Sequence, residues 1–151
     1  MPKKLPKIPT NKITTKMPKE ITKKIIVDAS AIMALINQEE GYKIVEKHLN
    51  HAIISSVNFS EALVIINRSI PDEPTQKQAA QLLKNTFPQI INFDPTQAQL
   101  AATLDKSTKP HGLSLGDRAC LALAKQKNLP VLTADKVWKK LKIGVDVGLI
   151  R

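Results

Sequence analysis

The sequence predicts an α/β fold in which helices cover a parallel sheet. From Lys24 onward, short runs of β-branched residues alternate with longer segments of helical periodicity, and this order is typical of parallel sheets with crossover helices. No internal repeat interrupts the alternation. The chain has 151 residues, a length that suits one hydrophobic core, so we expect a single folded domain over residues 25–151.

The expected strands lie where apolar runs are short. We expect them at residues 25–28, 52–55, 89–93, 130–133 and 145–150. Periodic segments between the strands predict helices. We expect these at residues 31–36 and 42–49, around Glu61 with Ser56 or Asn58 as the cap, from Thr75, from Asp94, from Ser114 to Ala124 and around Trp138, with a polar loop at 107–112.

Four acidic residues lie near the edge of this predicted sheet. Right-handed crossovers bring the carboxyl ends of parallel strands to one edge, and open α/β sheets bind ligands there. Asp28 ends the first strand, Asp135 follows the fourth strand by two residues, and Asp117 lies in the first turn of an apolar helix. Glu61 joins them from the helix after the second strand.

Several carboxylates in one cleft predict a site for a divalent metal ion. Their mutual repulsion raises their pKa values unless a cation neutralises them. Mg²⁺ prefers oxygen ligands and keeps several waters, so carboxylates and a substrate phosphate complete its coordination. Bound metal lowers the pKa of a water and stabilises a leaving oxygen. The four acids therefore predict hydrolysis of a phosphodiester.

The simpler alternative is that each acid only caps a helix. Segments 114–117 and 58–61 both match the capping-box pattern, in which an acid accepts from the backbone N–H of the cap residue. Asp28 and Asp135 each precede a predicted helix, where a carboxylate is favoured. Asp94 also ends a strand, but capping explains it fully, so it is left out of the site. Only the joint arrangement of the four acids favours metal binding.

Four segments together resemble PIN-domain ribonucleases, most closely the VapC-type toxins of bacterial and archaeal toxin–antitoxin pairs. The segments are IVDAS at 26–30, VNFSE at 57–61, SLGDRACLALA at 114–124 and LTAD at 132–135. The resemblance extends over about residues 25–151. Two features depart from it: the Lys-rich leader at 1–24, and Gly116 at a position where related toxins often have Ala.

The resemblance implies a fold, an activity and partners. The implied fold is a five-stranded parallel sheet flanked by helices, and the implied activity is Mg²⁺- or Mn²⁺-dependent endoribonuclease action on structured RNA such as tRNA or rRNA. A small antitoxin would restrain it, and a homodimer is expected. The implied metal-binding acids are Asp28, Glu61, Asp117 and Asp135, with the hydroxyls of Ser30 and Thr133 near the site.

Charge and composition indicate which classes of protein and which locations the sequence allows. The formal charge is +10, and most of the excess lies in residues 1–24, which carry eight lysines and one glutamate. Four prolines favour a flexible leader, either a solvated extension or a weak phosphate-binding one. The single Cys120 excludes an internal disulfide, and no apolar run approaches the ~20 residues of a membrane helix. We expect a soluble, cytoplasmic protein without a membrane partner.

Two other function classes stay open. A catalytically inactive PIN-like module that binds RNA or protein would draw its affinity from the basic leader, and its binding would survive loss of the acids. A phosphoacceptor domain would need paired acids after the first strand. Only Asp28 stands there, and position 30 is Ser.

Overall fold

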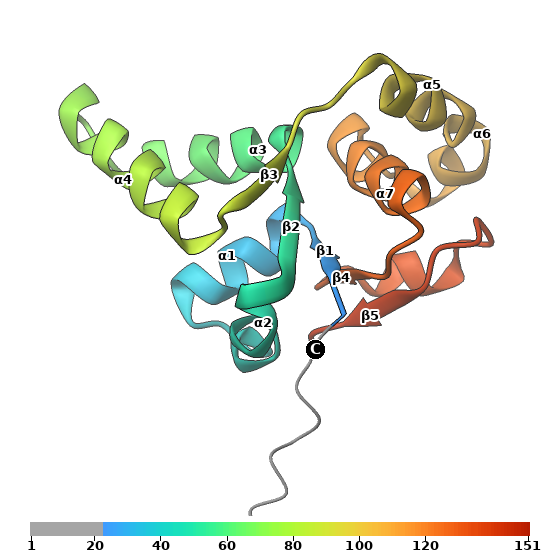
Figure 1. Cartoon of the computed structure of the whole chain (residues 1–151), viewed down its shortest axis with the longest axis horizontal. Coiled ribbons are helices and arrows are strands. Elements are labelled where there is room, and N and C mark those ends of the chain that lie inside the picture. The colour runs from blue at the N-terminus through green and yellow to red at the C-terminus, as the bar shows by residue number, and fades with distance from the viewer. Residues whose placement is uncertain (1–22) are drawn as a thin grey trace, which may run out of the picture.

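The computed structural model describes residues 23–151, and it confirms a five-stranded parallel sheet with helices on both faces (Figure 1). The strands are β1 (Ile25–Val27), β2 (Ala52–Ser55), β3 (Gln89–Ile91), β4 (Val131–Thr133) and β5 (Val147–Leu149). Their order across the sheet is β3-β2-β1-β4-β5, and each adjacent pair is parallel. All five carboxyl ends therefore meet at one edge.

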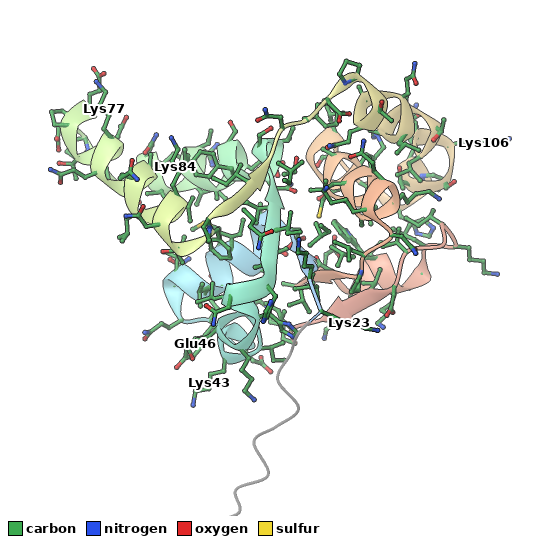
Figure 2. All side chains as sticks on the ribbon, viewed as in Figure 1. Lys23, Lys43, Glu46, Lys77, Lys84 and Lys106 are labelled. Atoms are coloured by element: carbon green, nitrogen blue, oxygen red, sulfur yellow. The ribbon has the colours of Figure 1, made fainter. Side chains whose placement is uncertain are left out.

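Helices connect these strands in the alternating order that the sequence predicts. The α-helices are α1 (Ala29–Asn37), α2 (Tyr42–His48), α3 (Ser56–Asn67), α4 (Glu73–Thr86), α5 (Pro95–Thr103), α6 (Asp105–Thr108) and α7 (Leu115–Lys127). Short 3₁₀ turns are η1 (Leu49–His51), η2 (Lys109–His111) and η3 (Lys136–Lys140). Charged side chains such as Lys43, Glu46 and Lys77 point away from the body (Figure 2), as expected for the solvent faces of amphipathic helices.

The sheet is buried on both faces, and this explains its continuous apolar strands. Successive side chains of a strand point to opposite faces. Ile25 and Val27 belong to a core cluster with residues of α1 to α4, whereas Ile26 packs in a second cluster with residues of α7. Helix α7 buries seven residues, Cys120 among them, so the predicted packing role of Cys120 is confirmed.

Three local predictions are wrong, each for a physical reason. The cap of α3 is Ser55, whose hydroxyl accepts from Val57 N at 3.2 Å, and not Ser56 or Asn58, which lie inside the helix. Helix α4 begins two residues before Thr75, because the Asp72 side chain accepts from the amide of Thr75 at 2.8 Å.

The polar loop predicted at 107–112 is also wrong, since α6 and η2 occupy most of it. Thr108 is fully buried there, and its hydroxyl donates to Leu104 O at 2.7 Å. Strands β1, β3, β4 and β5 are one to three residues shorter than predicted. Most of the leader predicted at 1–24 lies outside the described residues and stays a prediction. In the described part of the chain, no helix is long and apolar enough to cross a membrane.

Candidate functional site

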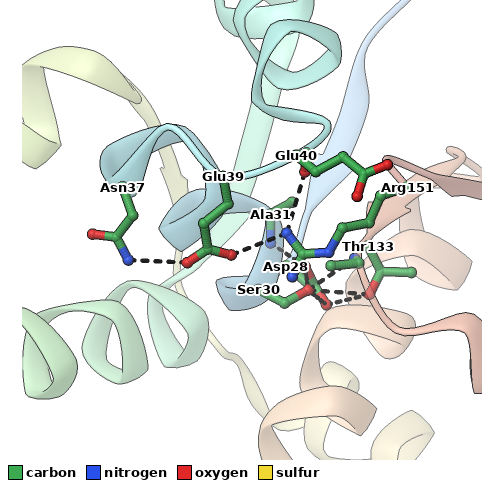
Figure 3. Close-up of polar contacts among 9 residues, drawn as sticks. Asp28, Ser30, Ala31, Asn37, Glu39, Glu40, Thr133 and Arg151 are labelled. Carbon is green, nitrogen blue, oxygen red and sulfur yellow. Dashed lines mark hydrogen bonds and ion pairs between the residues drawn. The ribbon is translucent and has the colours of Figure 1, made fainter.

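The candidate site lies where the chain reverses its direction across the sheet. Strand β1 pairs with β2 on one side and β4 on the other, so the gap between helices that a ligand can enter opens at the ends of β1 and β4. Asp28 follows β1 and Thr133 ends β4. Thr133 Oγ1 donates to Asp28 Oδ2 at 2.6 Å, directly across this point (Figure 3).

Two further groups besides Thr133 donate hydrogen bonds to Asp28. Ser30 Oγ donates to Asp28 Oδ1 at 2.7 Å, and the amide of Ala31 donates to the same oxygen at 2.9 Å, which makes Asp28 the cap of α1. Ser30 Oγ also accepts from Ala134 N at 2.9 Å. The structure thus places the two predicted supporting hydroxyls, Ser30 and Thr133, against Asp28.

Burial makes the charge of Asp28 costly. The residue is 4% exposed, and desolvation raises the pKa of its carboxyl to about 6, with a smaller contribution from the charge of Asp117. The hydrogen bonds from Thr133, Ala31 and Ser30 oppose this shift. Of the ion pairs among residues 23–151, none includes Asp28. Within this part of the chain, the carboxylate is therefore neutralised only by a proton or by an added cation.

Glu61 reaches the same edge from α3. The amide of Asn58, one turn earlier, donates to Glu61 Oε2 at 2.8 Å and to Gly116 O at 3.1 Å. The predicted capping box at 58–61 is therefore wrong, because Asn58 lies inside the helix and its side chain binds the acid itself. This contact ties the Glu61 carboxylate to the first turn of α7, beside Asp117.

The capping box predicted at 114–117 is confirmed. Ser114 Oγ accepts from Asp117 N at 3.2 Å, and Asp117 Oδ2 accepts from Ser114 N at 2.8 Å. Burial raises the pKa of the Cys120 thiol in α7, and the charges of Asp28, Asp117 and Glu61 add to this shift. Asp117 belongs to the first turn of α7, and the Asn58 side chain ties Glu61 to the same turn.

Asp135 joins this group indirectly. Its Oδ1 accepts from Val137 N at 3.0 Å and caps η3, as the alternative explanation predicts. Its own backbone N–H donates to Thr133 Oγ1 at 3.0 Å, and the same hydroxyl donates to Asp28. Thr133 therefore links the acid after β4 to the acid after β1.

The acids do not form a finished metal cage. Within residues 23–151, no three Asp, Glu, His or Cys side chains stand close enough together to hold one ion. Mg²⁺ is nevertheless commonly bound through one or two carboxylates and several waters. A buried carboxylate without a cationic partner, flanked by other oxygen donors, fits such an ion.

Sequence reasoning missed two residues of this region. Asn58 was interpreted as a helix cap, and Gly116 only as a departure from the family pattern. The i, i+3 spacing of Asn58 and Glu61 was the available signal, because it puts both side chains on one face of a helix. Beside Glu61, a hollow of about 530 Å³ runs along α3 and is lined by Ser60, Val64 and Arg68 among others.

Known structures share this fold. The chain is similar to a DNA-bound VapBC from Salmonella typhimurium, with 14% identity, a TM-score of 0.66 and coverage of 85% of this chain and 99% of that chain. A toxin–antitoxin complex from Klebsiella pneumoniae matches at 21% identity and TM-score 0.66, covering 85% and 98%. FitAcB from Neisseria gonorrhoeae matches at 21% identity and TM-score 0.61, covering 82% and 95%.

No curated protein matches the chain. Its sequence does match the PIN domain over residues 25–144. This stretch includes β1 to β4, every helix of the described residues, and all six of the acids and hydroxyls predicted for the site. The chain belongs to the PIN domain family.

Proposed function

We propose that this protein is a metal-dependent endoribonuclease, the toxin of a toxin–antitoxin pair. The observation that supports this most is Asp28, a buried carboxylate without a cationic partner among the described residues, at the point where the strand order reverses. Asp117 lies near enough for its charge to raise the pKa of Asp28. Membership of the PIN domain family supports the same activity.

Each acid has a place in this mechanism. Asp28, Asp117 and Asp135 would hold Mg²⁺ or Mn²⁺, and Glu61 would contact the ion directly or through a water. The bound ion would supply an activated water and neutralise charge on an RNA phosphate. Ser30 and Thr133 orient Asp28 by donating to both of its oxygens. No residue of the chain needs to form a covalent bond to the substrate.

Substrate and partners are part of the proposal. We expect structured RNA such as tRNA or rRNA as the substrate, and a homodimer in the cytoplasm as the acting species. The similar structures include toxin–antitoxin complexes, which supports a small antitoxin as the restraining partner. An apolar hollow of about 160 Å³ between α1, α3 and α4, lined by Ile36, Ile66 and Leu82 among others, offers that partner a docking surface.

Cleavage assays with matched variants test this function. Wild type, Asp28→Asn and Asp117→Asn are incubated with total RNA in Mg²⁺, in Mn²⁺ and in EDTA. Asp94→Asn is the control, because Asp94 also follows a strand and caps a helix, accepting from Gln97 N at 2.7 Å. We expect cleavage by wild type and Asp94→Asn only, and only with metal, since the other two variants lose a metal-binding charge. Mapping the fragment ends then identifies the RNA.

A binding module without catalysis is the second candidate. The finding that favours it is that Asp28, Asp117 and Asp135 all accept from backbone amides at helix N-termini, Asp28 and Asp135 as cap residues and Asp117 within a capping box. In the same assay, intact RNA with every protein, or equal cleavage by all variants, would contradict the nuclease. RNA binding that survives Asp28→Asn and weakens steeply with salt would then support the module.

A further inference from the structure

We propose that Asn58 and Gly116 are positioning residues that fix the carboxylate of Glu61 against the first turn of α7. Asn58 clamps one oxygen of that carboxylate, and the absence of a side chain at Gly116 makes the space for it. This inference rests on the proposed function, because metal binding is what Glu61 is positioned for. Neither residue would touch the ion or the RNA.

The Asn58 amide has one orientation that suits its surroundings. The side chain is 1% exposed, and both groups within its reach, Glu61 Oε2 and Gly116 O, are acceptors. Only the NH₂ end of the amide can satisfy them. Asn58 Oδ1 is buried and has no hydrogen-bond partner among residues 23–151, a cost that the two donated bonds must offset. The amide therefore serves Glu61 and α7 rather than its own helix.

Gly116 has no conformational reason to be glycine. It lies inside α7, and its φ is not positive, unlike those of Gly41, Gly112 and Gly144. A glycine inside a helix costs stability relative to alanine. A Cβ built at position 116 would overlap the Glu61 carboxylate. A side chain at position 116 would therefore push the Glu61 carboxylate away from the helix backbone, so glycine permits this close approach.

Together these contacts restrict a flexible side chain. A glutamate on a helix surface samples several rotamers, and ordering it costs conformational entropy. Asn58 and Gly116 hold the Glu61 carboxylate beside the turn that contains Asp117. Residues that orient a ligand of a metal typically change metal affinity about 10- to 100-fold when they are mutated. Loss of either contact should therefore weaken metal binding without changing the fold.

Direct Mn²⁺ binding provides a readout that is independent of activity. The full-length variants Gly116→Ala, Asn58→Ala and Glu61→Ala are titrated with Mn²⁺, and free ion is measured by electron paramagnetic resonance. Asn85→Ala is the control, since Asn85 is an exposed helix asparagine on α4. We expect Gly116→Ala and Asn58→Ala to weaken binding about 10-fold or more, and Asn85→Ala to bind as wild type. The urea midpoint of Gly116→Ala should equal or exceed that of wild type.

The double variants establish the route of the effect. If Gly116→Ala and Asn58→Ala act through Glu61, neither weakens Mn²⁺ binding further in the Glu61→Ala background. An undiminished effect there would overturn the inference, and so would wild-type binding by both single variants while Glu61→Ala binds weakly. Wild-type binding by Glu61→Ala itself would instead remove Glu61 from the metal site and overturn the inference with it. If Asn58→Ala does not fold, the Gly116→Ala pair decides alone.

Discussion

Asp28, on which the proposed metal site depends, is a buried carboxylate that lowers stability when it is charged. Its carboxyl has a pKa near 6 in the fold, against an ordinary value of 3.8. The folded protein therefore holds a proton between about pH 4 and pH 6 that the unfolded chain has released. Stability from this group is complete below pH 4 and is lost as the pH rises through 6. A shift of this size corresponds to about 3 kcal/mol.

Because the charged form of Asp28 destabilises the fold, removal of this charge should stabilise the protein at neutral pH. Asp28→Asn, unfolded by urea in EDTA, should gain stability relative to wild type as the pH rises from 4 to 7, because the amide carries no charge to desolvate. We expect the free energy of unfolding to rise by up to about 3 kcal/mol. The gain should be smaller to the extent that the NH₂ group of Asn replaces a carboxylate oxygen that accepts hydrogen bonds in wild type. A difference between the two proteins that stays constant with pH would contradict a buried, destabilising carboxylate.

The sequence predicted some residues of the site better than others. Asp28 could be placed at the edge of the sheet because the first strand ends there, whereas Ser30 and Thr133 were expected near it only from the resemblance to PIN-domain ribonucleases. Asn58 could not be placed, because Ser55, Ser56 and Asn58 are all cap-forming residues within four positions. Which of them starts the helix depends on where β2 ends, and that is decided by tertiary pairing with β1 and β3.

Among the elements, the connection between α1 and α2 depends on one glycine. Gly41 has a φ of +89° and lies against the backbone of Ile150, where a Cβ would overlap the carbonyl oxygen. The segment after β5 is also held by Arg151, which pairs with Glu39 at 3.0 Å and donates to Glu40 O at 3.2 Å (Figure 3). Ile150 and Arg151 thus pack against the connection between α1 and α2.

The second prediction compares two glycines of similar conformation. Gly112 has a φ of +73°, but a Cβ there meets nothing within 4 Å. Gly112→Ala should cost about 1 to 2 kcal/mol from backbone strain alone. Gly41→Ala should cost more than about 2 kcal/mol, because it also displaces Ile150. Urea denaturation of both variants measures this, and equal losses would show that the contact with Ile150 contributes nothing.

The type and order of the long elements followed from the sequence, but short elements did not. Helix α7 was predictable because its apolar residues and its capping box agree. Helix α6 has four residues, and all four are polar or charged, as in a loop. Its buried Thr108 nevertheless donates a hydrogen bond to Leu104 O, a contact that the sequence pattern does not reveal. Periodicity cannot be read over a single turn.

At the scale of the whole molecule, alternation predicts a parallel sheet but not its strand order. The order β3-β2-β1-β4-β5 depends on pairings between segments far apart in the chain.

The positive charge of the protein is distributed unevenly along its sequence. Residues 1–24 carry a net charge of +7, and residues 25–151 carry only +3. Lysines of the described part lie on separate sides of the body, as Lys43, Lys84 and Lys106 show (Figure 2).

The concentration of positive charge in residues 1–24 predicts how RNA affinity should depend on salt. RNA affinity falls with salt by a slope of about 0.7 per phosphate contact on single strands, so clustered lysines should dominate that slope. We compare two Lys→Gln sets in the full-length Asp28→Asn protein, chosen to prevent cleavage. The leader set is Lys3, Lys4, Lys7, Lys12, Lys16 and Lys19. The control set is Lys43, Lys47, Lys84, Lys106, Lys109 and Lys139, all exposed in the folded domain.

Filter binding between 50 and 200 mM salt, roughly the range over which such contacts weaken, measures both slopes. If the leader binds phosphates, its substitution should reduce the slope by up to about 4, whereas the dispersed control set should reduce it less. Equal reductions would show that RNA contacts the folded domain as much as the leader. An unchanged slope with the leader set would mean that those lysines are only solvated, and that RNA recognition depends on the edge of the sheet where Asp28 lies.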